Sequence, residues 1–207
     1  KPPEMLYCFG NVEIFKMPAI AIVGTRLATP YGKSQAFQFA KELSRRGVVI
    51  VSGLAYGIDA AAHYGALEGS GSTIAVLAGG LGRISPVENN LLAKKIIEKG
   101  GLLVSENPIG IKIKKHEFLK RNRLISGLSK AVIVVEAAER SGSLNTAAHA
   151  INQNRDVFAL PGRITDVQSA GTNKLLQKGA IPALSYVDIL EYLGIKDKKP
   201  MINDYPF

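Results

Sequence analysis

Short, continuous apolar segments recur along this chain and alternate with amphipathic helical segments. The apolar segments are 19–23, 48–51, 74–77, 102–104, 131–135 and 157–160, with a shorter one near 181–184. A strand that is apolar at successive positions is typical of a sheet covered on both faces. Strands separated by helices indicate parallel pairing. The pattern therefore predicts a doubly wound α/β fold, with a mainly parallel sheet and helices on both faces.

The length of 207 residues and a hydrophobic content of 46% suit one large domain. We expect an N-terminal segment over residues 1–17 that contributes an edge strand, a core domain over 18–194 and a polar tail over 195–207. In a sheet of this kind, ligands bind beyond the carboxyl ends of the strands. Function is therefore sought in the strand-to-helix loops 24–32, 52–59, 78–86, 105–117, 136–143 and 161–172.

The charge balance favours a polyanionic partner. Lysine and arginine number 26 against 17 acidic residues, a formal net charge of +9. The single cysteine, Cys8, fits a reducing compartment and predicts a cytoplasmic location. No apolar run approaches the roughly 18 residues of a membrane span, so no membrane association is expected. The chain begins Lys1-Pro2-Pro3 without an initiator methionine, which indicates a fragment.

The segment 136–144, E-A-A-E-R-S-G-S-L, reads as a tight loop between a strand and a helix. Ser141 or Ser143 can cap the helix, and Gly142 lets the backbone approach a ligand closely. N–H groups at the positive end of a helix dipole form a site for an anion, such as a phosphate. The alternative is an ordinary helix cap that binds nothing.

The loop Gly24-Thr25-Arg26 follows the strand 19–23 and places Arg26 where a phosphate would lie. Alternatively, Arg26 pairs with a carboxylate such as Glu136. The loop lacks the G-x-G-x-x-G fingerprint, and no Walker-type G-x-x-x-x-G-K-[ST] occurs, so classical nucleotide cofactors are not expected.

The segment 112–123, K-I-K-K-H-E-F-L-K-R-N-R, holds six basic residues and one glutamate. Cations that follow a backbone, with an aromatic ring that stacks a base, are typical of a single-strand binding groove. Alternatively, Phe118 anchors the core and the lysines are only solvated. Arg121 and Arg123 lie about 200° apart on a helix, so both cannot point into one site.

No catalytic or metal-binding set emerges from the sequence. Asp59 and His63 are four residues apart on one helical face, but no third ligand accompanies them. We expect Asp59 to cap its helix and His63 to be a packed or hydrogen-bonded companion. The serines of the S-G-S loop have no evident base. The chain therefore reads as a binding protein rather than an enzyme, without a metal or cofactor.

Several motifs, taken in order, resemble one known family. They are G-T-R…Y-G (24–32), S-G-L-A-Y-G-I-D-A-A-A-H (52–63), F-L-K-R-N-R-L-I-S-G-L-S (118–129), V-V-E-A-A-E-R-S-G-S-L-N-T-A (134–147), V-F-A-L-P-G-R (157–163) and S-A-G-T-N-K-L-L-Q-K-G-A (169–180). Over roughly residues 6 to 185 the chain is similar to the DNA-processing protein A (DprA, or Smf) family. Loop 78–86 departs from the family pattern at Gly82 and Ser85, and nothing is carried over from it.

The resemblance implies an extended Rossmann-like domain that forms a homodimer and binds single-stranded DNA. It also implies loading of the RecA recombinase during natural transformation in competent cells, without catalysis. The small helical N-terminal domain and C-terminal winged helix of many members are absent here. Carried over by position, the DNA site comprises Gly24, Thr25, Arg26, Lys115, Phe118, Arg121, Asn122, Arg123, Ser141, Gly142 and Ser143.

Two other classes share this kind of sheet. One is a nucleotide-cleaving enzyme of the lysine-decarboxylase-like type, whose P-G-G-x-G-T-x-x-E motif does not continue after Pro161-Gly162-Arg163. The other is a nucleotide-binding sensor without catalysis.

Overall fold

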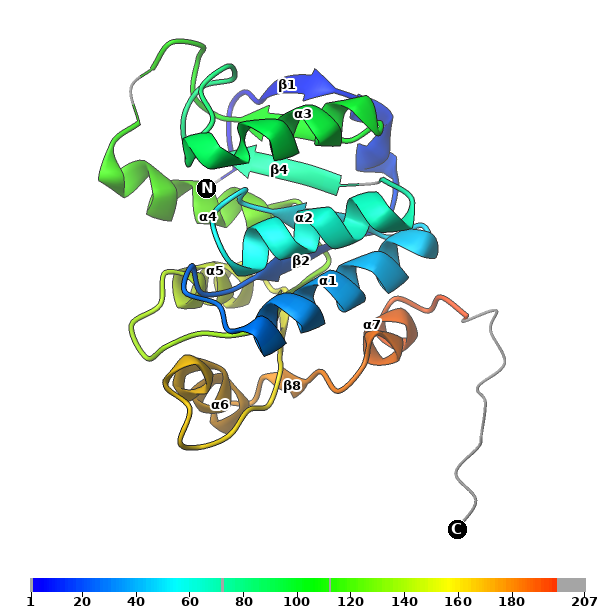
Figure 1. The fold of residues 1–207 in the computed structure, drawn as a ribbon, viewed down its shortest axis with the longest axis vertical. Coiled ribbons are helices and arrows are strands. Elements are labelled where there is room, and N and C mark those ends of the chain that lie inside the picture. Colours follow the sequence, from blue (N-terminus) through cyan, green and yellow to red (C-terminus); the bar gives the residue numbers. More distant parts are fainter. Residues whose placement is uncertain (1, 72, 112, 197–207) are drawn as a thin grey trace.

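One eight-stranded sheet organises the part of the chain that the computed structural model describes, residues 2–71, 73–111 and 113–196 (Figure 1). The strands are β1 (Tyr7–Gly10), β2 (Ala19–Val23), β3 (Val49–Ser52), β4 (Thr73–Leu77), β5 (Leu102–Ser105), β6 (Ala131–Val134), β7 (Asp156–Ala159) and β8 (Ile181–Pro182). Their order is β1-β5-β4-β3-β2-β6-β7-β8. β1 pairs antiparallel with β5, whereas β2 to β8 pair in parallel. The predicted doubly wound, Rossmann-like and mainly parallel sheet is confirmed.

Helices cover both faces of this sheet (Figure 1). They are α1 (Pro30–Arg45), α2 (Ile58–Gly69), α3 (Asn90–Glu98), α4 (Lys115–Gly127), α5 (Ser143–Asn152), α6 (Ala170–Gln177) and α7 (Tyr186–Tyr192), with short 3-10 turns at Val12–Lys16, Val87–Asn89 and Val167–Ser169. Successive strand side chains point to opposite faces. Ile20 and Ile22 of β2 therefore join the cluster of Phe39 in α1, whereas Ala21 and Val23 join that of Leu124 in α4.

The apolar periodicity of the sequence predicts a helix from Lys33 to Arg46, whereas helix α1 begins at Pro30, three residues earlier. The Thr29 hydroxyl accepts the Gly32 N–H at 3.0 Å, and Pro30 occupies the first helical position, where its missing N–H costs nothing. Lys33 therefore belongs to the first turn of α1, close to the carboxyl end of β2.

The order of strands reverses between β2 and β6. From β2 the chain adds β3, β4 and β5 on one side, then returns to place β6 on the other side of β2. The loop after β2 leads to α1 on one face, and the loop after β6 leads to α5 on the opposite face (Figure 1). Loops that diverge in this way open a crevice at the carboxyl ends of the two strands.

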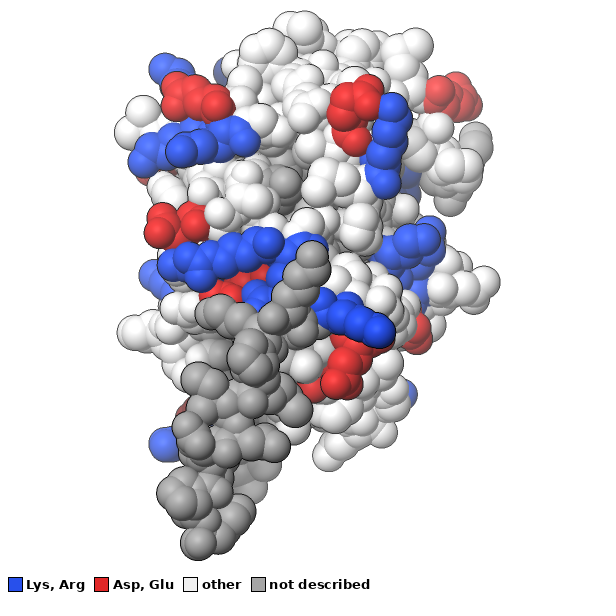
Figure 2. Space-filling view, turned by 90° about the vertical axis from the view of Figure 1, so that its right-hand side faces the viewer, with Lys and Arg blue, Asp and Glu red and all other residues white. Residues whose placement is uncertain are grey.

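The opposite edge, where the parallel strands begin, carries charges of both signs (Figure 2). At the C-terminal end of α1, Glu42 pairs with Arg45 at 3.0 Å and with Arg46 at 2.7 Å. Such intermixed charges give no extended field of one sign, so this edge is a poorer anion site than the crevice.

The predicted division into an N-terminal segment, a core domain and a C-terminal tail is only partly covered by the described residues. The segment before residue 18 contributes the edge strand β1, as predicted, and Leu6 and Cys8 pack against the core. Of the predicted tail, residues 197–207 lie outside the described part, so the domain boundaries stay predictions. None of the described helices combines the length and the apolar character needed to cross a membrane.

Candidate nucleic-acid interface

A cavity of about 920 Å³ opens at the switch between β2 and β6. Its walls come from the loop after β2, the loop after β3, helix α4 and the loop before α5. Nine of the eleven predicted site residues line it: Gly24, Thr25, Arg26, Phe118, Arg121, Asn122, Ser141, Gly142 and Ser143. Lys115 and Arg123 lie outside this lining. The fold thus brings most of the predicted residues together, while their contact with DNA stays a prediction.

The loop after β2 is held tightly, which places Arg26 at the rim. A Cβ at position 24 would lie 2.5 Å from an Ile58 side-chain carbon, so the close approach requires glycine. The Thr25 N–H donates to the Glu136 carbonyl at 2.7 Å. The Arg26 guanidinium carbon then lies 5.1 Å from the centre of the Phe118 ring, a cation–π distance.

The Glu136 carboxylate forms its hydrogen bonds with Thr29 and not with Arg26. Its buried carboxylate accepts the backbone N–H of Thr29 at 2.9 Å and also the Thr29 hydroxyl. This carboxylate therefore secures the start of α1 to the end of β6, and the alternative that Arg26 pairs with Glu136 is wrong. Phe118 is half-buried, with its ring beside Arg26 at the cavity.

The S-G-S loop differs from its prediction. Gly142 occupies the N-cap position of α5 without a side-chain cap, while the Ser143 N–H donates to the Ser141 hydroxyl at 3.3 Å. The N–H groups of Leu144 and Asn145 donate to the carbonyls of Ser141 and Gly142. Most N–H groups of the loop are thus satisfied within it, which weakens the expected backbone anion site. Neither serine occupies the predicted N-cap position, although the Ser141 hydroxyl accepts the N–H of the first helical residue, Ser143.

Arg121 has a structural position within the basic helix α4. Its buried guanidinium donates to the Gly53 carbonyl at 2.7 Å and to the Val76 carbonyl, which ties α4 to the ends of β3 and β4. Burial lowers the pKa of Arg121 to about 10, and the neighbouring Asp59 opposes this shift. Arg123 instead pairs with Glu106, so the two arginines diverge as the helical geometry predicts.

Asp59 and His63 belong to the same buried region beside the cavity. Asp59 does not cap α2, since Gly57 holds that position; its carboxylate accepts the N–H of Gly53 at 3.1 Å. Burial raises the pKa of Asp59, and Arg121 opposes this shift. His63 Nδ1 lies 2.8 Å from the Thr73 hydroxyl, and burial lowers the pKa of His63 to about 3. His63 is therefore a neutral, hydrogen-bonded core residue, as predicted.

The chain matches the family model for DNA recombination-mediator protein A over residues 1–194. The chain belongs to this family. It is 47% identical to the DNA processing protein DprA of Bacillus subtilis over 193 residues, 93% of this chain and 65% of the relative. It is 46% identical to the protein Smf of Escherichia coli, covering 92% of this chain and 51% of that relative.

The solved DNA processing protein A of Helicobacter pylori superposes with a TM-score of 0.85 at 37% identity, covering 93% of this chain and 88% of that chain. That protein is described for its unique single-stranded DNA binding mode. The chain spans about half to two thirds of the length of the curated relatives above. The family suggested by the motifs is thus confirmed for this part of the molecule.

Sequence reasoning missed several residues that line this cavity, among them the polar side chains Lys33, Tyr56, Arg140 and Gln168. Lys33 could have been found from the Thr29-Pro30 helix start. Arg140 directly precedes the S-G-S loop, and its charge was the available signal. Tyr56 and Gln168 reach the cavity from loops whose course no local pattern specifies.

Proposed function

We propose that this chain binds single-stranded DNA, protects incoming DNA and loads the RecA recombinase during natural transformation, in the cytoplasm and without catalysis. The observation that carries the proposal is the charge of the switch-point cavity. Three exposed cations line it, Arg26, Lys33 and Arg140, whereas the buried Arg121 is bonded to the protein and lies beside the one carboxylate, Asp59. The single-stranded DNA binding of the Helicobacter pylori relative supports the same assignment.

The aromatic lining favours an unpaired strand. Phe118 and Tyr56 both border the cavity, and Tyr56 is 43% exposed. Bases that are free of a duplex can stack on such rings while cations follow the phosphates. In a duplex the base faces are already stacked, so a blunt duplex gains nothing from the rings.

Binding should therefore be markedly salt-dependent and without strong sequence preference. Each neutralised phosphate of a single strand releases about 0.7 counterions, so affinity falls steeply as salt is raised. Fluorescence anisotropy with a labelled oligonucleotide measures the slope. Affinity that is unchanged between low and physiological salt, or equal for a blunt duplex, would contradict an electrostatic single-strand site.

A nucleotide-cleaving or nucleotide-sensing protein is the alternative. Within the S-G-S loop, the Ser141 and Ser143 hydroxyls lie 2.8 Å apart and bond to each other. Filter binding of single-stranded DNA, run beside an assay for nucleoside monophosphate binding and hydrolysis, separates the three classes. Hydrolysis without DNA binding would favour the enzyme, and nucleotide binding alone would favour the sensor.

We also expect a homodimer through residues 160–193. β8 is the outer strand of the sheet, and its Ile181 and the nearby Leu184 are exposed by 39% and 76%. An open edge with apolar side chains is suited to pairing with another chain. Leu184→Glu should convert a dimer to a monomer in light scattering. Leu91→Glu on α3, 69% exposed near the other end of the sheet, is the control and should leave the dimer intact.

A further inference from the structure

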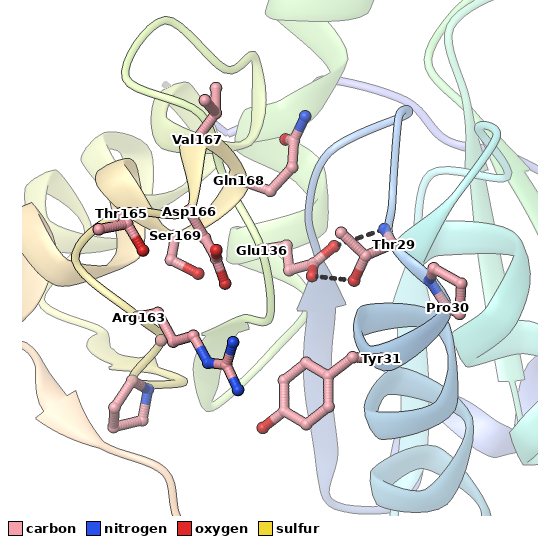
Figure 3. A pocket seen from close by; sticks show the side chains of 12 residues that line it. Thr29, Pro30, Tyr31, Glu136, Arg163, Thr165, Asp166, Val167, Gln168 and Ser169 are labelled. Carbon is pink, nitrogen blue, oxygen red and sulfur yellow. Dashed lines mark hydrogen bonds between the residues drawn. The ribbon is translucent and has the colours of Figure 1, made fainter.

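A second cavity, of about 870 Å³, has Glu136 of the loop after β6 in its lining (Figure 3). The start of α1 forms one wall and the loop 161–169 forms the other, with Glu136 at the back. Gln168 lines both cavities, so they adjoin. The Gln168 Oε1 is buried, and no donor reaches it within the described residues.

The wall formed by α1 presents an aromatic ring on a fixed support. Tyr31 is 57% exposed and faces Arg163 across the cavity (Figure 3). A Cβ at Gly32 would lie 2.2 Å from the Glu136 carboxylate, so this turn reaches the carboxylate only because position 32 is glycine. The bonds between Thr29 and Glu136 then hold Tyr31 in place.

The charge of the second cavity is opposite in sign to that of the first. One cation, Arg163, faces two carboxylates, Glu136 and Asp166. This lining does not favour phosphate. It suits a neutral ring whose amino groups donate hydrogen bonds, because carboxylates accept from the exocyclic amine of a base such as cytosine. Thymine offers no exocyclic amine and is the poorer fit.

We propose that the second cavity is a base subsite for single-stranded DNA. It receives one unstacked base of the strand whose phosphates the first cavity holds, stacks it against Tyr31 and favours an amino-bearing base over thymine through Asp166. This inference rests on the proposed DNA binding. It adds a binding site for one base and a preference for an amino-bearing base at that site.

The test compares oligodeoxycytidylate with oligothymidylate of equal length by fluorescence anisotropy. The unaltered chain should bind the cytosine strand about fivefold or more tightly, the lower end of the 1–3 kcal/mol expected for discrimination by one base contact. Tyr31→Ala should weaken binding of both strands without changing the salt slope, since it removes no charge. Asp166→Ala should abolish the preference because it removes the acceptor, and the affinity ratio is the readout because the charge change alters both affinities. Tyr64→Ala, an exposed tyrosine on α2, is the matched control.

The outcomes separate the subsite from the proposed function. Equal affinities for both strands, with Tyr31→Ala silent while Arg26→Ala weakens binding, would overturn the subsite and leave DNA binding intact. Binding of free deoxycytidine that Tyr31→Ala abolishes, with oligonucleotide binding unchanged, would also overturn it as a DNA subsite. If the unaltered chain binds no single-stranded DNA, the proposed function itself fails.

Discussion

Replacing Arg121 with methionine should lower the free energy of unfolding by about 3–5 kcal/mol, because two hydrogen bonds from a charged group are lost and each contributes about 1.5–3 kcal/mol. The variant leaves the Gly53 and Val76 carbonyls without their guanidinium donor, and it leaves Asp59 buried without its neighbouring cation. Urea unfolding measures the loss. DNA affinity per folded molecule should change far less than stability, because the guanidinium bonds to the protein itself.

Two further variants make this expectation specific. Lys120→Met on the same helix removes a half-exposed cation 3.6 Å from Glu106 and should change stability by less than about 1 kcal/mol. Asp59→Asn combined with Arg121→Met should recover part of the loss, because an amide oxygen can still accept the Gly53 N–H without an unpaired charge. A loss below 1 kcal/mol for Arg121→Met alone would show that the buried contacts do not hold α4 to the sheet.

Much of the fold could be predicted because a buried parallel strand is recognisable in the sequence as a short run of consecutive apolar residues. The run Ala19 to Val23 is apolar at every position, and it forms β2 at the centre of the sheet with those bounds. Helix starts were less certain. The start of α1 depends on one hydroxyl of Thr29 and on its bonds to Glu136, a residue 107 positions away. No local pattern contains such a long-range contact.

The site shows the same division between local and long-range information. The positions of the loops follow from strand order, so nine predicted residues meet at one cavity. The direction of an individual side chain does not follow in this way. Arg121 points inward because the carbonyls near the ends of β3 and β4 accept its hydrogen bonds and Asp59 lies beside it. Most N–H groups of the S-G-S loop bond to carbonyls of the same loop. The second cavity depends on Tyr31, which has no motif of its own.

Arg26→Ala should weaken binding of single-stranded DNA roughly 10- to 100-fold, since hydrogen bonds to a charged group contribute about 1.5–3 kcal/mol. The salt slope should also flatten by roughly one phosphate contact. Arg26 can make such a contact because its guanidinium lies at the cavity rim, and Glu136, its alternative partner, is bonded to Thr29. Arg83→Ala removes the same charge from an exposed position outside the cavity lining and should leave affinity and slope nearly unchanged.

Phe118→Ala should weaken binding by about 1–3 kcal/mol per stacked base and leave the salt slope nearly unchanged. The 5.1 Å contact between Arg26 and the Phe118 ring adds a sharper expectation. The ring also holds the guanidinium in place, so the two losses overlap, and the double variant should lose less than the sum of the single variants. A melting temperature that falls sharply for Phe118→Ala, with affinity per folded molecule intact, would instead make Phe118 a core residue. Strict additivity would mean that the cation–π contact does not shape the bound state.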